Sequence, residues 1–158
     1  VLSDFQVSVP EIGTIVAKVK PLVFLTSNNT REMSDALKRR CLHLHIPFPE
    51  AKVERTILER RVPGLSQTLN RELVAFVQAV RAIDLKKQPS VSETIDWAKT
   101  LLLLNAEHLS LDLVRDTLNV FLKFEQDIAS ATEQLPALLA QARKDAELPL
   151  SSHHASHA

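Results

Sequence analysis

The chain has 158 residues, 45% of them hydrophobic, and its 19 basic and 19 acidic residues leave no formal net charge. This length allows one fair-sized core, or a small domain with part of another. The absence of net charge argues against the broad positive surface on which nucleic-acid binding usually depends, so we expect no nucleic-acid partner.

Cysteine usage and the first residues predict the compartment. Cys41 is the only cysteine, which excludes an internal disulfide and suits a reducing environment. The opening residues VLSDFQVSVP have neither the basic nor the apolar region of a signal peptide. The apolar stretches are too short to cross a bilayer. We therefore expect a soluble, cytoplasmic protein with no membrane contact.

The first 48 residues have the pattern of strands. Residues 5–9 and 14–17 flank the turn-like sequence PEIG, and 21–26, PLVFLT, is continuously apolar, as in a strand buried on both faces. A short helix over 33–40 leads to 41–46, CLHLHI, which alternates like another strand. This order predicts part of an α/β sheet. Because one short helix cannot cover both faces, residues 1–48 are expected to be the end of an α/β core that begins elsewhere.

Helices are predicted from Pro49 onward. A compact bundle with short connections is expected over residues 49–130, from helices at 49–61, 69–83, 90–106 and 110–128. A last helix over 136–147 and a disordered polar tail would complete residues 131–158. The predicted fold class is thus mainly α with a small α/β part.

Periodicity also predicts which helix faces are buried. In the helix at 49–61, Val53, Ile57 and Leu58 are expected on one apolar side. The helix at 90–106, which includes Trp97, is apolar around most of its circumference, so it is expected to be central. In the helix at 69–83, four polar residues are expected on the solvent side, Arg71, Glu72, Gln78 and Arg81.

The densest polar chemistry follows residues 21–26. Asn28 lies at the tip of the predicted buried strand, where ligands of α/β sheets bind, and its carboxamide could position a water and a phosphate oxygen. Arg39 and Arg40 lie just before the next strand, and a guanidinium makes bidentate bonds to phosphate. Each also has a simpler explanation: asparagine suits turns and helix caps, and cations favour helix carboxyl ends.

These motifs resemble the AAA+ ATPases, and within them the MoxR-type group. LVFLTSNNTRE is similar to the sensor-1 strand, with Asn28 at the sensor position, and SDALKRRCLHLHIPFP to the segment that carries the arginine finger, with Arg40 at the finger position. PEIGTIVAKVKP and QPSVSETIDWAKTL resemble MoxR-type proteins associated with maturation of carbon monoxide dehydrogenase. The resemblance covers roughly residues 2–128 and implies the end of an ATPase core followed by a helical lid.

The resemblance implies roles for four residues. Asn28 and Arg40 would be catalytic, and Asn28, Arg39 and Ser90 would contact the nucleotide; no metal ligand is expected. ATP and Mg²⁺ would be bound by the full-length parent, because the family's phosphate loop GxxxxGK[ST] and acidic magnesium-binding strand do not occur in these 158 residues. Gly13 and Gly64 are isolated and form no Gly-rich loop. The chain alone is expected neither to bind these cofactors nor to hydrolyse ATP.

The implied partners are those of the family. The parent would form a ring with neighbouring AAA+ subunits, expected to be a hexamer, and remodel a metalloenzyme client together with a protein carrying a von Willebrand factor A-type domain. The chain alone is expected to self-associate, because strands without neighbours expose unpaired edges.

The expected lid departs from many AAA+ lids at one place. Many of those lids open their third helix with a nucleotide-contacting arginine, whereas this chain has QPSVSE there. Ser90 and Glu93 are instead spaced as a capping box. A helix amino end attracts phosphate, but Glu93 would oppose it. Lys86 and Lys87, just before the cap, are possible substitutes.

Other candidates have structural explanations. His43 and His45 would share one strand face, without a recognisable third metal ligand. Trp97 and Cys41 are expected to be buried. Two other functions stay open, a clamp-loader-like AAA+ subunit and a non-catalytic helical interaction module.

Overall fold

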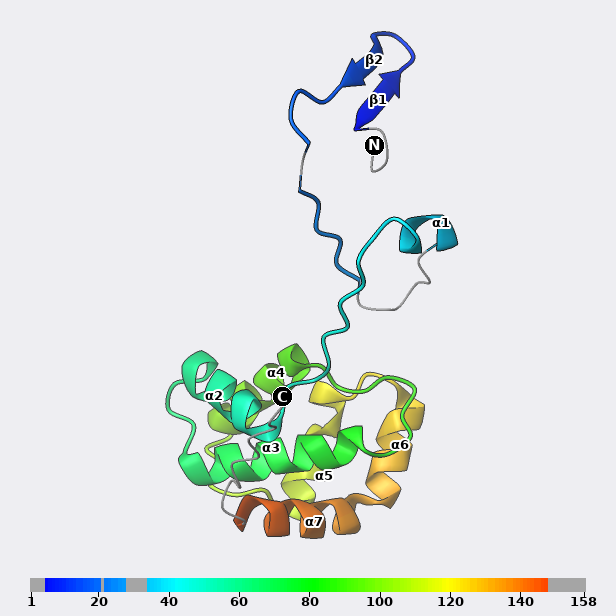
Figure 1. Cartoon of the computed structure of the whole chain (residues 1–158). Coiled ribbons are helices and arrows are strands. Elements are labelled where there is room, and N and C mark those ends of the chain that lie inside the picture. The colour runs from blue at the N-terminus through cyan, green and yellow to red at the C-terminus, as the bar shows by residue number, and fades with distance from the viewer. Residues whose placement is uncertain (1–4, 21, 28–33, 148–158) are drawn as a thin grey trace, which may run out of the picture. The chain divides into compact units, whose positions relative to one another are not determined.

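The computed structural model describes residues 5–20, 22–27 and 34–147, which form two compact units, Val1–Ile46 and Pro47–Ala158. We refer to the second as the helical unit. The described part is mainly helical with one small antiparallel sheet, as the sequence predicts. Figure 1 labels the elements, which are β1 Gln6–Val9, β2 Gly13–Val16, α1 Asp35–Lys38, α2 Ala51–Arg61, α3 Gln67–Arg81, α4 Val91–Leu103, α5 Leu111–Phe121, α6 Glu125–Glu133 and α7 Leu135–Glu147.

The predicted strands around PEIG are confirmed as a hairpin. β1 and β2 pair in antiparallel register, with Val7 opposite Ile15 and Val9 opposite Gly13. The Ile12 amide donates to the Val9 carbonyl at 3.1 Å, closing a turn with Pro10 at its first central position. Gly13 follows with φ of 86°, a conformation that glycine adopts without a side-chain clash.

The other two predicted strands are not formed. Residues 22–27 and 42–50 have no regular secondary structure, and the helix expected over 33–40 is limited, within the described residues, to α1. Strand geometry requires a neighbour that satisfies backbone groups, and among the described residues only β1 and β2 pair. The apolar side chains of these segments are exposed, including Leu22, Phe24, Leu42 and Leu44.

Serine caps begin three helices of the helical unit. The hydroxyls of Ser66, Ser90 and Ser110 accept from the backbone amides three residues later, at the starts of α3, α4 and α5. At Ser90 the Glu93 carboxylate also accepts the Ser90 amide at 2.7 Å, so the predicted capping box is confirmed. These caps fix the helix starts, and hence the side chains that each helix turns inward.

Both α3 and α4 contribute buried residues to the core, and α3 contributes more of them. α3 packs against α2, α4 and α7, and α4 packs against α2, α3 and α5 (Figure 1). Leu103, the last residue of α4, and Leu104 after it are exposed, so the carboxyl end of α4 is not enclosed as the sequence predicts for a central helix. Three aromatic rings occupy the centre, and the Trp97 and Phe121 centroids lie 4.4 Å apart in a stacked arrangement, with Phe76 beside both. The Trp97 indole donates to the Thr117 hydroxyl at 2.8 Å, so its burial leaves no unpaired donor. Burial of Trp97 is confirmed.

The helix expected over 110–128 is two helices. α5 ends at Phe121, Leu122 and Phe124 are extended, and α6 begins at Glu125. The break lets buried Asp127 of α6 reach the backbone amides of Lys86 and Lys87, at 2.8 and 3.1 Å. The prediction of one continuous helix over 110–128 is therefore wrong, and the separate α6 contributes a side chain that holds a loop distant in sequence. α7, predicted over 136–147, is confirmed and packs against α3.

Within the part of the chain that the structure describes, no helix combines the length and apolar character needed to cross a membrane.

Candidate functional site

Asn28, the predicted sensor residue, lies outside the described residues. Arg39 and Arg40, which follow α1, are both exposed. Arg40 Nη1 donates to the carbonyl of Ala36 one turn earlier, at 3.0 Å. Within the described residues neither arginine has an acidic partner, so both guanidinium groups present their charge to solvent.

Ser90, the third predicted contact of the nucleotide, is the N-cap residue of α4, and its hydroxyl is engaged in the cap. Its hydroxyl accepts from the Glu93 amide at 3.4 Å. Lys87 binds the Glu93 carboxylate at 2.8 Å, and the Lys86 ammonium lies 4.4 Å from the centroid of the Phe124 ring. Both lysines considered as substitutes for the missing arginine therefore contact side chains of their own unit.

The contacts of the Glu93 carboxyl change its pKa. Burial by itself would raise its pKa, but hydrogen bonds from Lys87 and from the Ser90 amide and hydroxyl, with the Lys87 charge, lower the pKa below its ordinary value. The charged carboxylate is thus the favoured form at the start of α4. It neutralises a nearby lysine and caps the helix.

The remaining sequence candidates do not form a site among the described residues. Cys41 is half-buried, and His43 and His45 are exposed in a segment without strand geometry, so their predicted common strand face does not exist. Within residues 5–20, 22–27 and 34–147 no three His, Cys, Asp or Glu side chains gather as metal ligands.

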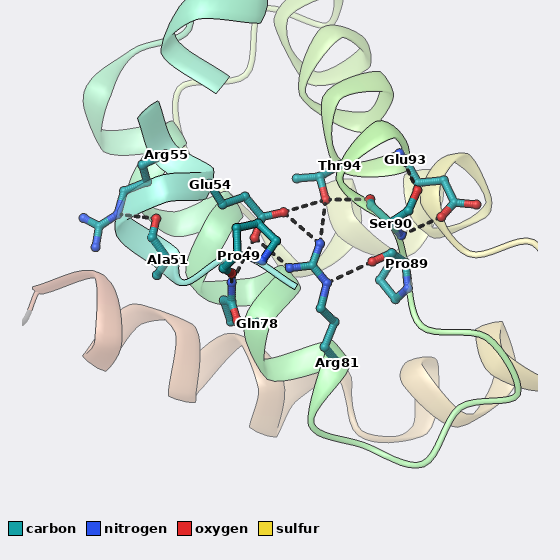
Figure 2. Close-up of polar contacts among 10 residues, drawn as sticks. All are labelled: Pro49, Ala51, Glu54, Arg55, Gln78, Arg81, Pro89, Ser90, Glu93 and Thr94. Atoms are coloured by element: carbon teal, nitrogen blue, oxygen red, sulfur yellow. Dashed lines mark hydrogen bonds and ion pairs between the residues drawn. The ribbon is translucent and has the colours of Figure 1, made fainter. Parts of the chain in front are cut away.

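Sequence reasoning missed the main polar cluster of the helical unit, which joins Glu54 of α2 to Arg81 of α3 (Figure 2). The Arg81 guanidinium binds both Glu54 oxygens, through Nη1 at 2.7 Å and Nη2 at 2.8 Å. The side chains are 5% and 0% exposed. A bidentate pair of this kind is strong in a low-dielectric interior, but only if its other hydrogen-bonding groups are also paired.

Three further groups complete that pairing. Thr94 Oγ1 of α4 lies 3.0 Å from Glu54 Oε1 and 3.2 Å from Arg81 Nη2. Gln78 Nε2 donates to Glu54 Oε2 at 2.9 Å. Arg81 Nε donates to the Pro89 carbonyl at 2.9 Å. The cluster therefore ties α2, α3 and α4 together at one buried point.

The cluster corrects two predicted helix faces. In α2 the buried residues are Glu54 and Leu58, and Val53 is 51% exposed. In α3 Arg81 is 7% exposed although its charge suggested the solvent side. Charged side chains are expected at the surface unless they are paired. The sequence of α2 or α3 alone does not show the partner on the other helix, so burial of Glu54 and Arg81 is not predicted from either.

Glu72, also predicted on the solvent side of α3, has a structural role as well. Its Oε2 accepts the Leu109 amide at 2.7 Å, and its Oε1 lies 3.0 Å from His108 Nδ1. The carboxylate thereby holds the loop before α5 against α3. This loop contact accounts for the position of the Glu72 carboxylate without a bound ligand.

No protein-family model, curated protein or solved structure was found to match this chain.

Proposed function

We propose that the chain is the sensor, arginine-finger and lid portion of a MoxR-type AAA+ ATPase of the cytoplasm. The parent would couple ATP hydrolysis to remodelling or maturation of a metalloenzyme. Its active unit would be a ring, with each Arg40 directed at the nucleotide of the neighbouring subunit. A protein with a von Willebrand factor A-type domain is the partner that the resemblance suggests.

The observation that carries this proposal is the exposure of apolar side chains in two segments beside the proposed catalytic residues. Leu22 and Phe24 are 83% and 82% exposed, and Leu44 is 85% exposed. Burial of such side chains is worth about 1.5–3 kcal/mol each, so a stable assembly is expected to cover them. Strands of a larger α/β sheet would do so, and would place Asn28 and Arg40 at strand ends.

The division of labour follows from side-chain chemistry. Asn28 would hold the attacking water, and Arg40 would stabilise charge that develops on the transferred phosphoryl group, an effect of about 10³–10⁵ in rate for arginine fingers. The exposure of Arg40 is consistent with action on another subunit. Neither glycine can help to cradle phosphates, since Gly13 closes a hairpin and Gly64 lies between helices. The phosphate loop and the magnesium ligands of the site would therefore come from another part of the parent.

The helical unit would be the lid. In this role Ser90 is proposed to lie near the nucleotide, and Arg39 of the first unit is proposed to contact the nucleotide as well. Glu93 caps α4 and places a negative charge at the helix start. The lid would therefore contact the nucleotide there through uncharged groups and shape complementarity more than through a cation.

One observation favours a second function, that of a non-catalytic helical interaction module. The helical unit has its own hydrophobic core, and its central ion pair is satisfied internally. A unit of this kind can fold and bind a partner without nucleotide.

The gene that encodes the chain discriminates between the two functions. The ATPase proposal predicts that the reading frame upstream of Val1 encodes a GxxxxGK[ST] loop and an acidic strand. A frame that lacks both would overturn the ATPase proposal and leave the interaction module.

Substitution in the full-length parent then tests the finger. Arg40→Ala should lower ATP turnover by about 10³-fold while nucleotide affinity changes little. Arg61→Ala is the matched control, because it removes an exposed arginine of α2 that has no proposed contact with the nucleotide, and it should leave turnover nearly unchanged. Unchanged turnover in Arg40→Ala would remove Arg40 from the mechanism.

A further inference from the structure

The last turns of α3 hold the backbone just before two other helices (Figure 2). Gln78 Nε2 donates to the Pro49 carbonyl at 3.0 Å, next to the N-cap residue of α2. Arg81 Nε donates to the Pro89 carbonyl at 2.9 Å, next to the N-cap residue of α4. Because Gln78 and Arg81 are three residues apart, they lie on one face of α3.

Phe48 extends this arrangement toward the start of the helical unit. Its ring centroid lies 4.6 Å from the Arg81 guanidinium carbon, within the range of a cation–π contact. Two hydrogen bonds to the Glu54 carboxylate hold the guanidinium in place, independently of its contact with Phe48. Phe48 and Pro49 are therefore attached to a fixed point in a buried cluster.

The residues directly before Phe48 have no such attachment. Leu44 and Ile46 are 85% and 80% exposed. Among the described residues, no hydrogen bond or ion pair involves residues 42–47. Few contacts and an exposed backbone are the features of segments that move on fast timescales.

We propose that Gln78 and Arg81 form a latch that fixes Phe48 and Pro49 to the helical unit, so that any motion between the two units pivots within residues 42–47. The helical unit then moves as one body that begins at Phe48, and not at the first turn of α2. Through the shared Glu54 carboxylate, the latch joins the incoming chain to α2, α3 and α4. The proposal holds for this chain whether or not the ATPase proposal is correct.

Backbone ¹⁵N relaxation of the intact chain tests the latch. We expect low heteronuclear NOE values, typical of motion on the picosecond to nanosecond scale, at residues 42–46, and values equal to those of α2 at Phe48 and Glu50. Values at Phe48 and Glu50 as low as those at Leu44 would overturn the proposal.

Two variants test whether these contacts set the boundary between the residues with low NOE values and those with the values of α2. Gln78→Leu removes the bond to the Pro49 carbonyl, and Phe48→Ala removes the contact with Arg81. At least one should extend the low values to Glu50 while the Trp97 fluorescence stays that of the folded core. Gln141→Leu is the matched control, because the Gln141 amide bonds only Asp145 of its own helix. If neither variant moves the boundary, the latch does not exist.

Discussion

At the scale of single residues, Arg81 and Glu54 show how a buried charge pair depends on both partners. Arg81→Met would leave the Glu54 carboxylate without its counter-charge in a site that is 0% exposed. We expect a loss of about 3–5 kcal/mol in the free energy of unfolding, since removal of one partner leaves an uncompensated buried charge. Chemical denaturation followed by Trp97 fluorescence measures the loss.

A double variant tests whether the stability lost in Arg81→Met comes from the buried charge that is left without a partner. Glu54→Leu combined with Arg81→Met replaces both charges with apolar groups, and should recover most of the stability lost in Arg81→Met. A double variant less stable than the single variant would contradict this account. Arg115→Met, at an exposed pair on α5, is the control and should change stability by less than about 1 kcal/mol.

Glu93 gives stability a dependence on pH. Because folding lowers the pKa of Glu93, its contribution is present above the ordinary value of 4.5 and is lost as pH falls through the lower folded value. Glu93→Gln keeps an acceptor for the capping box but removes the charge. We expect it to be about 0.5–1 kcal/mol less stable than the wild type at pH 7, with the gap closing below pH 4.5.

Thermal unfolding between pH 3 and 7 tests this difference. Glu133→Gln, at an exposed position on α6, should show no such narrowing. If the difference in stability between Glu93→Gln and the wild type is the same at every pH, the charge of Glu93 does not stabilise the cap.

At the scale of elements, Asp127 links α6 to a loop that is distant in sequence. Its two oxygens accept the amides of Lys86 and Lys87, so α6 holds the loop between α3 and α4. Asp127→Ala should cost about 1.5–3 kcal/mol, the range for hydrogen bonds to a charged group. Asp116→Ala on the exposed side of α5 should be nearly neutral.

Hydrogen exchange then tests the location of the effect. In Asp127→Ala the amides of Lys86 and Lys87 should lose protection while those of α3 keep theirs. Equal loss throughout the helical unit would mean that Asp127 supports the whole core and not this loop.

At the scale of the whole molecule, the exposed apolar segments predict self-association. Sedimentation velocity at rising concentration should show dimers or larger species, because association with another chain would bury the exposed side chains of Phe24 and Leu44. Leu44→Asp should weaken association by about tenfold or more, as expected for the loss of about 1.5 kcal/mol or more of burial.

An exposed leucine in the helical unit supplies the control. Leu103 is 82% exposed at the end of α4, so Leu103→Asp makes the same chemical change elsewhere. Equal weakening by both variants would show that association is not specific to the first unit, and a monomer at all concentrations would contradict the prediction.

The sequence by itself determined the elements whose causes are local. The Pro10–Gly13 turn, the Ser90–Glu93 cap and the apolar period of α3 each depend on residues a few positions apart, and each is present as expected. The proposed roles of Asn28 and Arg40 also come from sequence alone, and they stay predictions.

Only the tertiary structure decided which charges are buried and which apolar segments are not. Glu54 and Arg81 are 27 positions apart, and Asp127 and Lys86 are 41 apart, so no local pattern marks them as partners. Residues 22–26 have the composition of a buried strand, but a strand forms only when a neighbour supplies its hydrogen bonds. Pairing between distant groups decides both outcomes, since a charge or a backbone amide is stable away from water only beside its partner.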